Sequence, residues 1–202
     1  MAETGYNGLS VPRIVDAGET MQTVLPEVAG LRDMGLMVYG PGEQIQCENV
    51  NLHFPPMPEA EGAILSVIEN AKPAGHTALA KATRMAAEAL GNGRVPATLM
   101  LITDGKDTCY GRPCALAAEL APSDLKVHMI GFRVHADALN WKGGDAGPED
   151  EKIPAIARCL ADETGGVYVS ANSLHELIEA LRETLGCNFF SALTGPQDPR
   201  FN

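Results

Sequence analysis

The stretch Ala97-Thr98-Leu99-Met100-Leu101-Ile102-Thr103 is apolar at almost every position. It has the length of one β-strand, and a continuous apolar run is typical of a strand covered on both faces of a sheet. A second such run extends from Leu125 to Val134. Between them, Pro113 suits the first turn of a helix over residues 112–120. Strand, helix and strand in this order predict two parallel strands joined by a crossover helix.

The alternation of strands and helices continues on both sides of this unit. Helical periodicity predicts further helices, over residues 10–28, 59–70, 78–90, 151–163 and 173–185. Further strands are expected over residues 34–39, 45–54 and 167–170. The strand over 45–54 follows its neighbour after a Gly40-Pro41-Gly42 turn, so we expect it to return antiparallel. The sequence therefore predicts an α/β fold of three layers, a mostly parallel sheet flanked by helices, with one antiparallel hairpin strand at its edge.

Length and charge limit the organisation and the partners of the chain. Its 202 residues suit one domain, which we place at residues 1–186, followed by a C-terminal tail at 187–202. Lys and Arg number 15 against 26 Asp and Glu, a net charge of −11, which disfavours binding to nucleic acids. No apolar run approaches the roughly 20 residues that span a bilayer. The first ten residues show no signal-peptide pattern, which has a cationic and then an apolar segment.

Five cysteines leave the disulfide pairing open. They stand at positions 47, 109, 114, 159 and 187 and form no C-x-x-C pair, which disfavours a structural zinc site. Cys109 and Cys114 are near enough in sequence to form a disulfide across a short loop, and Cys47 with Cys159 is a second candidate pair. Small buried hydrophobic residues are an equally good interpretation of these cysteines.

Two loops gather polar groups where parallel strands end. Asp104, Gly105 and Asp107 follow the strand at 97–103, and Gly75-His76-Thr77 precedes the helix at 78–90. In open α/β sheets, ligands bind beyond the carboxyl ends of the strands. A carboxylate and a hydroxyl at one rim suit a hard cation such as Mg²⁺. From spacing alone, ordinary roles of Asp104 in a turn and of Thr77 as a helix cap explain these residues better than a metal site does.

Signals of an enzyme are weak in this sequence. No G-x-S-x-G, P-loop or G-x-G-x-x-G motif occurs, and the five histidines fall on different elements. We expect His128 to be a satisfied core histidine. An α/β enzyme of hydrolase or transferase type would have to use Asp104 and Asp107 as acid, base or metal ligands. Because no nucleophile, base and oxyanion donor converge, a non-enzymatic binding module is the first hypothesis.

Several of these segments together resemble the von Willebrand factor type A domain family. The stretch from Thr98 to Gly105 resembles its fourth strand and the following loop, and Gly75-His76-Thr77-Ala78-Leu79 resembles its G-x-T-x-L loop. Thr164-Gly165-Gly166-Val167-Tyr168 and the helix after it are similar to the last strand and helix of the family. Tyr39-Gly40 with Cys47, and the stretch from Thr108 to Cys114, resemble a bacterial subgroup. The resemblance covers about residues 10–185.

The resemblance implies a protein-binding or adhesion function at a metal-ion-dependent adhesion site. Thr77 and Asp104 match two of its ligand positions, and Gly75, His76, Gly105 and Asp107 would form the partner-binding rim around them. The ion would be Mg²⁺ or Mn²⁺, with a carboxylate of a protein partner completing its coordination. The D-x-S-x-S motif that supplies the other ligands is absent, so we expect a partial, weak site. The bacterial subgroup implies an exported or periplasmic protein.

The resemblance also implies that the central strand carrying D-x-S-x-S is missing. That strand would lie between the strands at 34–39 and 97–103. Three arrangements would resolve the gap, since buried backbone groups need partners: a strand encoded upstream, direct pairing of the two neighbours, or insertion of Asn188–Leu193. If another chain supplied the strand, the protein would be a structural subunit of an oligomer.

Overall fold

The computed structural model describes residues 12–40, 47–72, 76–103, 107–132 and 155–186, with side chains from residue 158 onward in the last range. Its helices are α1 (Arg13–Val28), α2 (Glu61–Asn70), α3 (Leu79–Ala89), α4 (Pro113–Leu120), α5 (Ala155–Glu163) and α6 (Leu174–Thr184), with a 3-10 turn, η2, at Gly91–Gly93. Its strands are β1 (Met34–Tyr39), β2 (Val50–Met57), β3 (Ala97–Thr103), β4 (Leu125–Phe132) and β5 (Tyr168–Ala171). The predicted alternation of strands and helices is confirmed.

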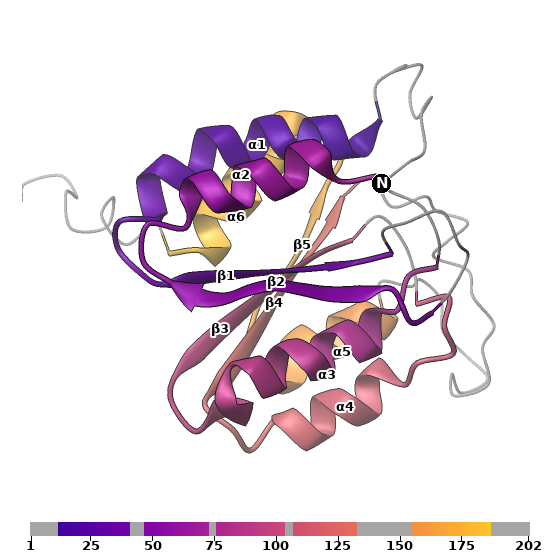
Figure 1. Cartoon of the computed structure of the whole chain (residues 1–202). Coiled ribbons are helices and arrows are strands. Elements are labelled where there is room, and N and C mark those ends of the chain that lie inside the picture. Colours follow the sequence, from indigo (N-terminus) through magenta and orange to yellow (C-terminus); the bar gives the residue numbers. More distant parts are fainter. Residues whose placement is uncertain (1–11, 41–46, 73–75, 104–106, 133–154, 187–202) are drawn as a thin grey trace, which may run out of the picture.

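The strands form three layers with the helices. Helices α1, α2 and α6 lie on one side of the strands, and α3, α4 and α5 lie on the other (Figure 1). Strands β3, β4 and β5 are parallel and adjacent in this order, with Leu101 opposite Met129 and Ile130 opposite Val169. Fully buried side chains such as Val127, Met129 and Phe132 show that β4 is covered on both faces. The continuous apolar run predicted this.

Two glycines after α5 let the chain reverse and bring β5 close to β4. Gly165 has a φ of +68°, which lets the chain reverse after the helix. At Gly166 a Cβ would lie 2.0 Å from the carbonyl oxygen of Val127, so only glycine lets this backbone approach β4. The amide of the next residue, Val167, donates to His128 Nδ1 at 3.1 Å. Burial lowers the pKa of His128, so this nitrogen stays an acceptor near neutral pH. His128 is thus hydrogen-bonded, as expected from the sequence, but it is only half-buried and is not a core residue.

The antiparallel hairpin differs from the prediction in its position. Strand β2 spans Val50–Met57, further along the chain than expected, and includes Pro55 and Pro56. Prolines are tolerated there because β2 pairs with β1 alone among the described strands and is therefore an edge strand.

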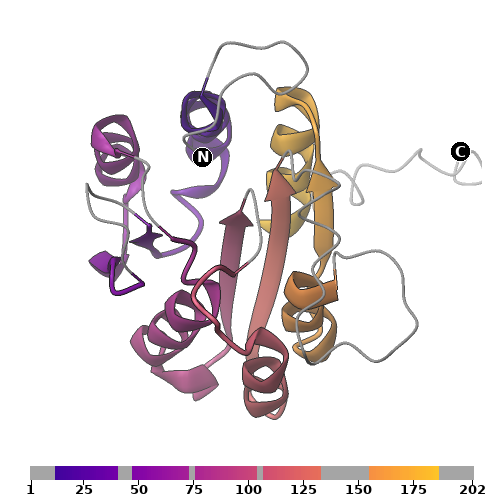
Figure 2. The same ribbon diagram turned by 90° about the vertical axis from the view of Figure 1, so that its right-hand side faces the viewer.

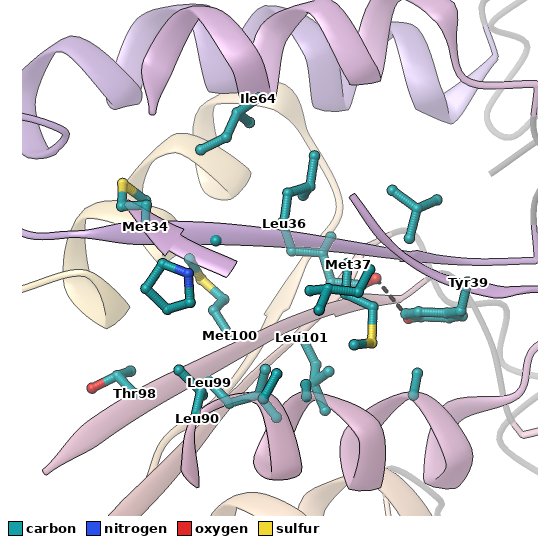
Figure 3. A pocket seen from close by; sticks show the side chains of 18 of the residues that line it. Met34, Leu36, Met37, Tyr39, Ile64, Leu90, Thr98, Leu99, Met100 and Leu101 are labelled. Carbon is teal, nitrogen blue, oxygen red and sulfur yellow. Dashed lines mark hydrogen bonds between the residues drawn. The ribbon is translucent and has the colours of Figure 1, made fainter. Parts of the chain in front are cut away.

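The sheet is divided between β1 and β3. Strands β1 and β2 form one two-stranded sheet, and β3, β4 and β5 form a separate three-stranded sheet. Figure 2 shows the hairpin and the parallel sheet as neighbours, with α1 above and α3 below them. Direct pairing of the strands at 34–39 and 97–103, one of the three arrangements considered for the gap, is therefore wrong. A cavity of about 1330 Å³ lies between them, which we call the groove; residues of β1 and β3 form its sides (Figure 3).

Two disulfides join segments far apart in the sequence, and neither is the predicted pair. Cys47 bonds to Cys109 and Cys114 bonds to Cys159, with Cα–Cα distances of 5.5 and 5.3 Å. The predicted Cys109–Cys114 and Cys47–Cys159 pairs are wrong. Cys114 lies in the first turn of α4, which packs beside α5 and its Cys159, whereas Cys109 packs against a cluster formed by Val50 of the hairpin with Ala78 and Ala82. Cys187 lies outside the described residues.

Candidate functional site

The candidate site lies where β1 and β3 end. Two segments meet there, His76–Thr77 before α3 and Asp107–Gly111 after β3. The amide of Thr77 donates to Thr108 Oγ1 at 2.8 Å, and the amide of Thr108 donates to the carbonyl oxygen of Thr77 at 2.9 Å. These reciprocal hydrogen bonds fix the two segments side by side. The structure therefore brings Thr77 and the loop after β3 together, as the sequence predicts.

Asp107 holds this loop in shape. Its side chain is only 5% exposed. Oδ1 accepts hydrogen bonds from the amides of Cys109 at 2.8 Å and Gly111 at 3.1 Å, and Oδ2 accepts one from the amide of Ala80 at 2.9 Å. Ala80 lies in the first turn of α3, where amides have no partner within the helix and a negative charge is favourable. Asp107 thus ties the loop to α3, and its carboxylate is engaged by backbone rather than presented to a partner.

The loop projects one aromatic side chain that the sequence analysis did not single out. Tyr110 has a φ of +57° and is 92% exposed. It stands between Cys109, which is bonded to Cys47, and Gly111, where a Cβ would lie 2.4 Å from Asp107 Oδ2. A non-glycine residue with positive φ persists when its surroundings hold it there. An aromatic residue between a cysteine and a glycine was the signal in the sequence.

A partly buried tyrosine links the two sheets near this loop. The hydroxyl of Tyr39, the last residue of β1, donates to the carbonyl oxygen of Ile102 in β3 at 2.9 Å (Figure 3). Burial raises the pKa of Tyr39 to about 12, so the phenol stays protonated and keeps its donor. This bond places the carboxyl ends of β1 and β3 side by side. His76, Thr77, Thr103 and Thr108 line the groove at the same end.

The described part of this rim supplies few metal ligands. Thr77 contributes a hydroxyl, but Asp104 and the predicted rim residues Gly75 and Gly105 lie outside the described residues. Across the described ranges, no three His, Cys, Asp or Glu side chains are grouped so that they could hold a metal ion. The described residues do not by themselves fit a Mg²⁺ or Mn²⁺ site.

None of the helices in the described ranges has both the length and the apolar character needed to cross a membrane.

Known proteins share parts of this sequence and its fold. No family model matches the sequence. Over 145 residues it is 32% identical to the uncharacterized protein YwmD of Bacillus subtilis (strain 168). That match covers 69% of this chain and 57% of YwmD, so the chain spans little more than half the length of this relative.

Solved structures share the arrangement of helices and strands. A von Willebrand factor type A protein from Catenulispora acidiphila superposes with a TM-score of 0.60 at 15% identity, over 86% of this chain and 37% of that one. The chain has a von Willebrand factor type A (VWA) fold. An aerotolerance-related membrane protein from Bacteroides fragilis NCTC 9343 matches this VWA fold with a TM-score of 0.61 at 17% identity, over 89% and 90% of the two chains.

A more distant match carries a metal. Proximal thread matrix protein 1 from the mussel byssus, in a form with a zinc-occupied MIDAS (metal-ion-dependent adhesion site) motif, has a TM-score of 0.55 at 11% identity over 87% of this chain and 39% of its own. The VWA fold is therefore compatible with a metal site. At this level of identity the likeness concerns the fold alone.

Proposed function

We propose that this VWA chain is a non-enzymatic protein-binding module whose partners dock on the rim formed by His76, Thr77, Thr108 and Tyr110. The observation that carries the proposal is the fixed, outward presentation of Tyr110, which is 92% exposed on a loop held by Asp107 and by the Cys47–Cys109 disulfide. Exposed tyrosines on rigid supports bind partners at a low cost in conformational entropy. The rim also lies beyond the carboxyl ends of the strands, where ligands bind in open α/β sheets.

The enzyme alternative finds less support in the geometry. It requires the carboxylates of Asp104 and Asp107 as acid, base or metal ligands, and of the two only Asp107 lies within the described residues. The Asp107 carboxylate accepts three backbone hydrogen bonds and is 5% exposed, which suits a residue that shapes the loop.

Two disulfides favour a protein that folds in an oxidising compartment, so we place this module outside the cytoplasm.

Binding at the rim is tested with a displayed library of random peptides. Clones are selected on the biotinylated full chain and then titrated against variants. We expect Tyr110→Ala to weaken the selected clones by about 30-fold, the loss typical of a residue worth 2 kcal/mol at an interface. The matched control is Leu31→Ala, because Leu31 is 63% exposed and follows α1, ahead of β1 and at the other end of the strands. The proposed rim would be contradicted if both substitutions weakened the selected clones equally, or if neither substitution weakened them.

We also expect the rim to bind a divalent metal ion only weakly. Thr77 and Asp104 would hold Mg²⁺ or Mn²⁺ with poor affinity without the D-x-S-x-S ligands. A thermal melt in 1 mM Mg²⁺ is therefore expected to differ from one in EDTA by less than about 2 °C. A micromolar site would be saturated under these conditions, stabilising the chain by more than about 2.7 kcal/mol and raising the midpoint by roughly 5–10 °C. A shift of that size that disappears in Asp104→Ala would show that the site is strong.

A further inference from the structure

The groove has the shape and lining of a slot for one more strand. Met34, Leu36 and Met37 of β1 and Leu99, Met100 and Leu101 of β3 lie along its sides, with Ile64 of α2 above and Leu90 below (Figure 3). Its volume of about 1330 Å³ exceeds the roughly 300–1,000 Å³ that is usual for small-molecule pockets. A mainly apolar cavity of this size suits a segment of polypeptide.

The backbones that border the groove specify an extended occupant. Within the described residues, β1 pairs with β2 and β3 pairs with β4, so the other edge of each strand faces the groove. Backbone amides and carbonyls that are shielded from water need partners. A strand between β1 and β3 would satisfy both edges at once. Because α1 and α2 cover the groove on one side and α3 on the other, that strand should be apolar on both faces.

We propose that the segment Asn188–Leu193 of this same chain fills the groove, as a strand parallel to β3. The last described helix delivers the chain to this place. The hydroxyl of Thr184, the last residue of α6, lies 3.1 Å from the sulfur of Met100 in the middle of β3, and Leu185 is part of the groove lining. Gly186 has a φ of +79°, which turns the chain away from the helix axis immediately before the segment begins.

The handedness of crossovers favours this connection. The chain passes from β3 through α4 to β4 and through α5 to β5, moving away from the groove with both helices on one side of the sheet. Nearly all such crossovers are right-handed. A right-handed return in the opposite direction needs its helix on the opposite side, and α6 lies there (Figure 1). A strand that follows α6 into the groove obeys the same rule.

Length and composition of the segment also fit. Asn188-Phe189-Phe190-Ser191-Ala192-Leu193 has six residues, as β1 has, and four of them are apolar. Adjacent Phe189 and Phe190 would point to opposite faces of the sheet, where the α1 side and the α3 side of the groove are both mainly apolar, Arg13 of α1 being an exception. Attachment through Gly186 and Cys187 makes the insertion intramolecular, which gives it a high effective concentration. This inference is independent of the proposed rim.

Hydrogen exchange on the unmodified full chain tests the proposal. We expect the amides of residues 188–193 to exchange at least about a hundredfold more slowly than in the free peptide, because strand pairing protects them. Exchange at the rate of the free peptide would overturn the proposal and leave the groove to a strand from elsewhere. Protection that appears only on dimerisation, measured by light scattering over a dilution series, would also overturn it in favour of a second copy.

A substitution provides the second readout and its control. Phe190→Asp should abolish the protection of residues 188–193 and speed exchange in β3, since a charge in an apolar groove is unfavourable. Phe201→Asp makes the same chemical change in the same tail beyond the segment, and should leave both patterns unchanged. Equal effects of the two substitutions would show that the segment does not occupy the groove.

Discussion

Reduction of both disulfides is expected to lower the free energy of unfolding by about 6–8 kcal/mol and the melting midpoint by roughly 15–25 °C. The bonds Cys47–Cys109 and Cys114–Cys159 close separate loops with sequence separations of 62 and 45 residues. Loops of this length each restrict the unfolded chain by about 4 kcal/mol in the chain-entropy model, and because the loops do not overlap their contributions should nearly add. The loss approaches the whole stability of a typical domain, about 5–15 kcal/mol.

Thermal melts with and without a reductant measure this loss of stability. Variants in which both cysteines of one disulfide are replaced by serine show how much each bond contributes. Cys47→Ser with Cys109→Ser, and Cys114→Ser with Cys159→Ser, should each lower the midpoint by roughly half of the total. Cys187→Ser is the control, because both bonds leave that cysteine out. Peptide mapping under non-reducing conditions should recover residues 47 and 109 in one fragment pair. Recovery of Cys109 linked to Cys114 would contradict the structure.

Asp107→Ala is expected to lower the free energy of unfolding by about 3 kcal/mol, the second largest effect. The substitution leaves the amides of Ala80, Cys109 and Gly111 without the carboxylate that accepts their hydrogen bonds. Buried donors that lose a charged acceptor cost about 1–3 kcal/mol each, and partial access of water to the loop reduces their sum. Chemical denaturation measures the loss directly.

Asp107→Asn is the matched variant for this prediction. Its side-chain oxygen can still accept from the amides of Cys109 and Gly111, whereas its NH₂ group cannot accept from Ala80. We therefore expect an intermediate loss of about 1–2 kcal/mol. If Asp107→Ala and Asp107→Asn leave the stability at the level of the wild type, the carboxylate does not hold the loop, and the fixed presentation of Tyr110 loses its basis.

The layered fold was predictable because its signals are local. The strands at 97–103 and 125–132 are apolar at almost every position, and parallel strands buried on both faces need this composition. Pro113 and Ser173 mark the starts of α4 and α6, and the side chain of Ser173 indeed accepts from the amide of Glu176. The position of β2 was less predictable, because prolines end most strands and only the pairing in space shows that this one is an edge.

The position of the candidate rim in the fold follows from the sequence, whereas its contacts do not. The end of the strand at Thr103 located the rim, since ligands bind beyond the carboxyl ends of strands. Disulfide partners depend on which helices become neighbours, and the five-residue spacing of Cys109 and Cys114 carries no information about α5 or the hairpin. The role of Asp107 also depends on the approach of Ala80, which is 27 positions away in the sequence. Contacts of this kind arise from the tertiary fold.

The Cys47–Cys109 bond determines how the molecule should respond to tension. Cys47 precedes the hairpin strand β2, and Cys109 follows β3, so the bond joins the two separate sheets at the end where Tyr39 also bridges them. A force that pulls the hairpin from the parallel sheet therefore meets a covalent stop at the rim. The sheets should part first at their amino ends, near Met34 and Ala97, and swing about the disulfide as a hinge. If the proposed rim binds a protein partner, a rim that stays closed under load would keep that partner attached while the rest of the domain yields.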